Sequence, residues 1–163
     1  MSKGFTLVIV LCVFLTVKVW PSMVSIYVIE TGVPEEAVIY PHSELWENAF
    51  LDVFFEAGHI VTNDTTLRLY EKPSQEIIDF INLEEALSSG IDYVIIAQLN
   101  FSNDKMHPSD ISFFIYKVSN AEKITEKTIQ GRQQSGLPQR TQREELDYMK
   151  SIARGLSLKL NNL

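Results

Sequence analysis

The sequence predicts an α+β sandwich, in which helices cover one face of a single mixed β-sheet. Three observations predict this fold class. Apolar residues recur at the three-to-four spacing of amphipathic helices in two long segments. Runs rich in β-branched and aromatic residues, of strand length, lie between them, and glycine or proline closes most segments. The resulting order is β-α-β-α-β-β-β-α, and 163 residues suffice for one domain with a sizeable core.

The first half of the chain predicts two strands on either side of a long helix. Residues 25–32 are rich in β-branched and aromatic types and end at a glycine, which is typical of a strand. Ser43 is a suitable N-cap, apolar residues then repeat as far as Ala57, and Gly58 predicts the end of the helix. A second strand is expected at 59–63 and continues after a turn.

A second helical region and the most apolar strand follow. Three isoleucines form an apolar stripe after Pro73, and Asn82 with Glu85 resembles a capping box that starts a further short helix. Residues 91–101 begin almost entirely apolar, as expected of a central strand that is buried on both faces. The stripe consists of Ile77, Ile78 and Ile81.

The last third predicts two paired strands and a closing helix. Residues 111–119 and 122–130 read as strands joined tightly at Asn120-Ala121. The second of them alternates charged, threonine and isoleucine side chains, which is typical of a sheet edge. A polar loop is expected at 131–143, and an amphipathic helix at 144–160 closes the domain.

The N-terminal segment has the composition of a secretory signal. Lys3 precedes an unbroken apolar run from Phe5 to Val17, and the helix-breaking Pro21 follows shortly after. The run is shorter than the roughly 20 apolar residues of a membrane-spanning helix. We therefore expect a signal peptide or N-terminal anchor at 1–24 and a single α/β domain at 25–163.

Removal of this segment is the favoured interpretation, and its retention as an anchor stays open. Signal peptidase prefers small residues before the cut, which makes Ser22 and Ser25 the plausible positions. In both cases the domain is exported, and it is either periplasmic or anchored in the inner membrane facing the periplasm. Contact with the membrane is expected only through residues 5–20, if they are retained.

The cysteine content and the net charge indicate where the protein resides and which classes of partner it does not bind. The only cysteine, Cys12, lies in the signal segment, so the mature domain has no disulfide, which favours a bacterial periplasm. Removal of Lys3 and Lys18 lowers the basic count from 14 to 12 against 21 acidic residues, and the net charge falls from −7 to −9. This charge opposes binding to nucleic acid or to anionic lipid.

Residue types that could act in catalysis or bind a metal ion do not occur at the spacings of a known motif. We therefore predict no catalytic, cofactor-binding or metal site and no cofactor. His42 and His59 flank the first helix, roughly 24 Å apart, which is too far for them to share a metal ion. His107 lies in a loop rich in Asn and Asp, where Asp104 and Asp110 could join it around a cation. Turn formation explains this composition equally well.

Aromatic residues indicate a binding surface instead. Phe113 and Phe114 are adjacent in one predicted strand, so their side chains must face opposite sides of the sheet. The face without helices is then partly apolar, and the edge strand at 122–130 could accept a strand from a partner. The predicted docking surface consists of five residues, Phe113, Phe114, Tyr116, Ile124 and Thr128.

Three short segments of the sequence resemble those of a family of envelope proteins. Glu56-Ala57-Gly58 ends a helix just before a strand, and residues 87–97 read Leu-Ser-Ser-Gly-Ile-Asp-Tyr-Val-Ile-Ile-Ala. Tyr116-Lys117-Val118 lies in the first of two consecutive strands. Over residues 25–160 the chain is similar to the N-terminal domain of TolB and to the related CsgG and LpoB proteins. The chain departs from that group because it has no room for a β-propeller and no lipidation motif.

The resemblance implies a periplasmic or outer-membrane-facing accessory domain that docks other proteins. We therefore expect an exported, non-catalytic domain of the cell envelope whose partner is another envelope protein and not a nucleic acid. The alternative is an exported hydrolase or metal-binding enzyme with its site in the loop at 102–110. Any enzyme is the less favoured interpretation.

Overall fold

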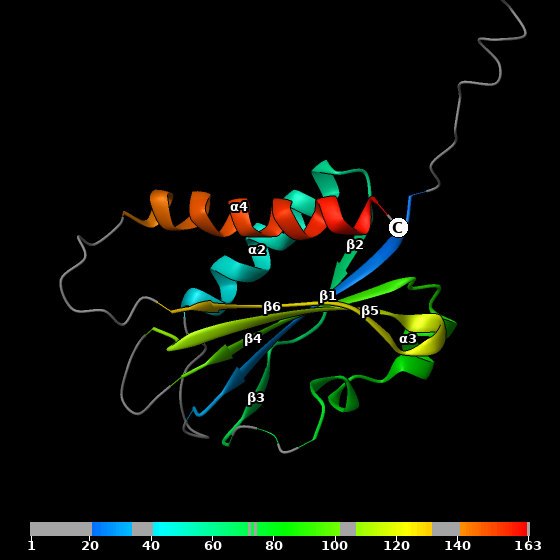
Figure 1. The fold of residues 1–163 in the computed structure, drawn as a ribbon, viewed down its shortest axis with the longest axis horizontal. Helices are drawn as coiled ribbons and strands as arrows, with labels where there is room; N and C mark the ends of the chain where they lie inside the picture. Colours follow the sequence, from blue (N-terminus) through cyan, green and yellow to red (C-terminus); the bar gives the residue numbers. More distant parts are fainter. Residues whose placement is uncertain are drawn as a thin grey trace, which may run out of the picture.

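The computed structural model describes residues 21–33, 41–71, 73, 75–101, 107–131 and 141–162. Of the predicted signal segment at 1–24, residues 1–20 lie outside the described residues, whereas Met23 and Val24 belong to the first strand. Figure 1 shows one twisted sheet with two long helices across one face and a short helix on the other. The sheet is mixed and has six strands, so the predicted α+β fold class is confirmed.

The strands follow the order β2-β1-β4-β5-β6, and β3 pairs with β1 on the same edge as β2. The strand β1 is parallel to β2, β3 and β4, whereas β5 is antiparallel to both of its neighbours, β4 and β6. The bounds are β1 Met23–Thr31, β2 Ile60–Asn63, β3 Leu67–Leu69, β4 Tyr93–Asn100, β5 Asp110–Lys117 and β6 Glu122–Gln130.

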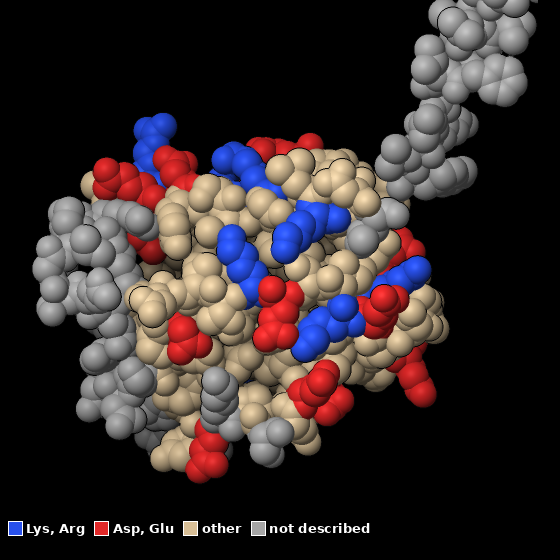
Figure 2. Space-filling model, viewed as in Figure 1, with Lys and Arg blue, Asp and Glu red and all other residues tan. Residues whose placement is uncertain are grey.

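The central strand and the edge strand are those that the sequence predicts. Within β4 the side chains of Ile95 and Leu99 face the long helices, and Val94 and Ile96 lie in the opposite cluster; all four are buried. The strand β6 lies at the edge and carries alternating charges. Figure 2 shows charges of both signs side by side on the molecular face that carries α4 and β6. Such charges protect an edge from unwanted pairing.

The helices begin where local capping chemistry allows. The described helices are α2 Pro41–Glu56, α3 Leu83–Ser88 and α4 Gln142–Leu160, with two short 3-10 turns, η1 Ile77–Phe80 and η2 Val118–Asn120. Thr141 and Glu144 form a capping box, so α4 begins two residues before the predicted start. The Asn82 Oδ1 atom accepts the Glu85 N–H at 3.2 Å, which confirms the predicted cap of α3.

The prediction that helices cover one face holds for α2 and α4 but not for α3. The short α3 and η1 lie on the opposite face of the sheet (Figure 1). There the isoleucine stripe of η1 packs with Phe114, Tyr116 and Ile96. The physical reason is that both faces of β4 and β5 carry apolar side chains, so each face needs its own cover.

A buried carboxylate connects the start of α2 to the sheet. Glu30, near the end of β1, is fully buried and accepts a hydrogen bond from Ser43 Oγ at 2.5 Å. Its second oxygen lies 3.0 Å from Arg68 Nε of β3. A buried charge needs such partners to offset the cost of leaving water. Glu30 therefore fixes α2 and β3 relative to β1.

Candidate functional site

The five residues of the predicted docking surface lie on two different faces. Phe113 is fully buried beneath α2, with its ring centroid 5.0 Å from that of Trp46. Ile124 packs against the same helix-covered core. Phe114 and Tyr116 belong to the opposite cluster, and Thr128 bonds to Ser112 at 2.9 Å. Because alternate residues of a strand point to opposite sides, Phe113 and Ile124 cannot share a surface with the others.

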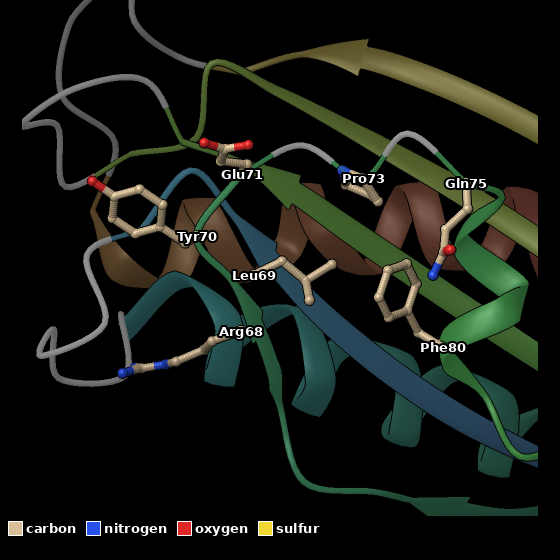
Figure 3. Close-up of a pocket in the computed structure, with 7 residues that line it drawn as sticks. All are labelled: Arg68, Leu69, Tyr70, Glu71, Pro73, Gln75 and Phe80. Atoms are coloured by element: carbon tan, nitrogen blue, oxygen red, sulfur yellow. The ribbon is translucent and has the colours of Figure 1, made fainter.

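Two adjoining hollows lie on the sheet face opposite α2 and α4. The larger, of about 450 Å³, is drawn in Figure 3 and is bounded by β3, the segment after it and η1. The smaller, of about 200 Å³, extends it towards β5 and β6. Both are lined by Pro73 and Gln75, so together they form one elongated depression, named here the open-face groove.

The lining of the open-face groove combines apolar and polar groups. In Figure 3 the side chains of Leu69, Pro73 and Phe80 surround a common space, while Arg68 points away from it. Tyr70 is 72% exposed at one end. The larger hollow is lined by Arg68, Leu69, Tyr70, Glu71, Pro73, Gln75 and Phe80. The smaller is lined by Pro73, Gln75, Glu76, Ile77, Gln98, Phe114, Tyr116 and Lys123.

Paired charges border this groove. Lys123 Nζ lies 2.9 Å from a Glu126 carboxylate oxygen and 5.8 Å from the centroid of the Phe114 ring. The hydrogen bond to Glu126 raises the pKa of Lys123, and burial raises the pKa of the Tyr116 phenol. At neutral pH one end of the groove therefore has the positive amine of Lys123, which is paired with Glu126, and the neutral, buried phenol of Tyr116.

A polar network fixes the ends of β1, β4 and β5. The Asn100 Oδ1 atom accepts hydrogen bonds from Thr31 Oγ1 at 2.5 Å and from Gln98 Nε2 at 3.0 Å. The amide nitrogen of Asn100 donates to Asp110, whose carboxylate also accepts from Ser109 Oγ at 3.1 Å. Asp110, expected as a possible cation ligand beside His107, therefore holds the start of β5 in place.

The structure pairs His107 with His42, a partner that sequence reasoning missed. His107 Nδ1 lies 2.5 Å from His42 Nε2, and the two rings are nearly perpendicular at 87°. The expected neighbour Asp104 lies outside the described residues. His59 lies beyond the other end of α2, against Phe54. No local signal could have found the pair, because its members are 65 residues apart.

Within the described part of the chain, no three His, Cys, Asp or Glu side chains are grouped so that they could hold a metal ion. None of its helices is both long and apolar enough to cross a membrane.

Solved structures of three bacterial envelope proteins are similar to this chain. Lipoprotein GNA1162 from Neisseria meningitidis matches with a TM-score of 0.50 and 9% identity, covering 83% of this chain and 97% of its own. TolB from Acinetobacter baumannii matches with a TM-score of 0.42 and 13% sequence identity. The match covers 86% of this chain but only 28% of TolB. The C-terminal domain of LpoB from Salmonella enterica matches with a TM-score of 0.42 and 13% sequence identity. The match covers 69% of this chain and 83% of the LpoB domain.

At these identities the likeness concerns the fold alone. TolB and LpoB are two of the three proteins that the sequence resembles, and the resemblance to CsgG is not shown by these structures. A search of curated proteins finds no match. A family model described as "Uncharacterised protein" matches residues 35–133, more than half of the sequence, so the chain belongs to this family of uncharacterised proteins.

Proposed function

We propose that this protein is an exported, non-catalytic accessory domain of the bacterial cell envelope that docks another envelope protein. The fold that it shares with lipoprotein GNA1162 supports an envelope role. The apolar run between Phe5 and Val17 supports export. In this proposal residues 1–24 act as the signal or anchor, and the remainder forms one folded unit.

The start of β1 constrains where a signal peptide can be removed. Met23, Val24 and Ser25 pair with β2, and Val24 and Ser25 also begin the pairing with β4. A cut after Ser25 would delete these residues from the sheet, whereas a cut after Ser22 leaves β1 whole. We therefore expect N-terminal sequencing of the exported protein to find Met23, or an earlier residue, as its first residue.

The open-face groove is the observation that carries the docking proposal. It is elongated, has room for side chains in two adjoining hollows, and offers apolar and hydrogen-bonding groups. Extended peptides are recognised by such series of side-chain pockets. We infer that the occupant is an extended segment of an envelope protein that carries at least one apolar side chain for the space between Leu69, Pro73 and Phe80.

Site-specific photocrosslinking in the native envelope tests this proposal. A photoreactive phenylalanine analogue replaces Tyr70 at the groove or Phe55 on α2, two aromatic positions that are 72% and 73% exposed. We expect one envelope protein to be crosslinked from position 70 and not from the matched control at position 55. Equal crosslinking from both positions, or none from position 70, would contradict docking in the groove.

A direct binding measurement completes the test. The crosslinked protein is purified, and its affinity for the full chain is compared with its affinity for Gln75→Trp, which fills the junction of the two hollows from an exposed position. We expect at least a tenfold loss of affinity, which corresponds to about 1.4 kcal/mol. Gln130→Trp, an exposed glutamine of β6 that lines neither hollow, serves as the control and should bind as the unmodified chain does.

A further inference from the structure

His42 and His107 place two metal-ligating nitrogens at one point. His42 lies in the first turn of α2, and His107 lies just before β5. The His42 Nε2 and His107 Nδ1 atoms are 2.5 Å apart, the ring centroids are 4.5 Å apart, and the rings stand at 87° to each other. Two imidazoles from distant parts of the chain therefore converge through their nitrogens and do not stack.

The surroundings keep the pair suitable for a cation. His42 is half-buried in the first turn of α2, and Glu145, in the first turn of α4, interacts electrostatically with it. Two imidazole nitrogens with a negative charge nearby are an environment that divalent transition metals favour.

We propose that His42 and His107 form a binding site for a divalent transition metal ion such as Zn²⁺. His42 Nε2 and His107 Nδ1 are the protein ligands, and water completes the coordination. The hydrogen that joins the two rings moves to the other nitrogen of the ring that carries it, so both facing nitrogens can bind the ion. With bonds of about 2.1 Å in tetrahedral geometry, the two nitrogens move apart to roughly 3.4 Å.

This site is independent of the proposed docking groove and has its own consequence. An ion held by both rings connects the start of α2 to the segment before β5, 65 residues further along the chain. Binding to the folded state alone raises stability. The affinity is moderate, since two protein ligands from the described residues are fewer than the three of catalytic zinc sites.

Zinc titration of the full chain tests the site. The protein carries no histidine tag, and Cys12→Ser is present in every sample, because Cys12 is the only thiol. Calorimetry at pH 7.5 compares the unmodified histidines with His42→Gln, His107→Gln and the control His59→Gln. We expect one Zn²⁺ per chain in the first and last, and at least a tenfold weaker affinity in each of the other two.

A spectroscopic measurement guards against loss of folding in the variants. Two-dimensional ¹H–¹⁵N spectra of the histidine rings of the otherwise unmodified chain should show the zinc-induced ¹⁵N shift at His42 Nε2 and His107 Nδ1, and none at His59. Absence of binding, binding that survives both substitutions, or a shift at other nitrogens would overturn the proposal.

Discussion

The two faces of the sheet differ in how completely their aromatic side chains are covered. Beneath α2 and α4, Phe113 is fully buried and packs against the rings of Trp46 and Phe50, at centroid distances of 5.0 and 5.7 Å. On the opposite face its neighbour Phe114 lies at the border of a hollow and keeps 9% of its surface exposed. The first face supplies the main core, and the second leaves a lined depression. The alternation of a single strand therefore separates the main core from the proposed docking groove.

Truncating the two adjacent phenylalanines should show the largest difference in stability between the two faces. We expect Phe113→Ala to lower the free energy of unfolding by about 3–5 kcal/mol, because it leaves a cavity in the aromatic core. Phe114→Ala should cost about 1–2 kcal/mol, because the groove already opens beside it. Urea denaturation of both variants measures the two free energies of unfolding. Equal losses of stability would show that both faces contribute equally to the hydrophobic core.

A second test concerns the buried charge that ties α2 to the sheet. Glu30→Gln removes the negative charge that faces Arg68 and should cost about 2 kcal/mol, less than for a fully buried pair because the Arg68 side chain is 24% exposed. The control is Asp52→Asn, which breaks the more exposed pair with Lys150 and should cost less than about 1 kcal/mol. Thermal denaturation compares them, and the expectation fails if Asp52→Asn is the more damaging.

Helix caps on the two faces offer a smaller contrast. Thr141→Ala removes one half of the capping box of α4 and should cost about 1 kcal/mol. Asn82→Ala removes the cap of α3, whose first turn covers the groove-bearing face, and should cost about 0.5–1 kcal/mol, because a short helix contributes less to global stability. Amide hydrogen exchange should show local opening of α3 and global destabilisation for α4; the reverse pattern would contradict this ranking.

The smallest expected effect is a pH dependence. Burial lowers the pKa of His59, although the nearby side chain of Asn161 opposes the change. The unfolded chain therefore binds a proton more readily, and this stability is complete above the ordinary pKa of about 6.5 and is lost as the pH falls below it. Unfolding free energies at pH 7.5 and 5.5 should differ less in His59→Gln than in the unmodified chain. If His59→Gln and the unmodified chain lose the same unfolding free energy between pH 7.5 and 5.5, titratable groups other than His59 cause the acid sensitivity.

Much of the fold follows from local chemistry that the sequence displays. The strand at 122–130 is observed at its predicted bounds because its alternation and its flanking turn are local signals. Asn82 caps α3 as predicted, and Gly58 ends α2 with a φ of +91°, a conformation that glycine adopts without strain. These features depend on neighbours within a few residues, so reading the chain suffices to find them.

The candidate sites could not be predicted in the same way. The docking prediction contained Phe114 and Tyr116, which line the groove, but also Phe113, which lies in the core. Sequence alternation shows that Phe113 and Phe114 point to opposite sides, but it does not show which side the long helices cover. The groove further requires β3, η1 and β5 to meet, and these come from three separate segments.

The sequence by itself determined the order of the elements, the central and edge strands and the apolar N-terminal run, because periodicity, capping and turn residues act over short distances. Only the tertiary structure decided that α3 lies opposite α2 and α4, that Phe113 is inside, and that His42 meets His107. Each of these depends on contacts between segments that are distant along the chain, and their free energy is realised only when the sheet has formed.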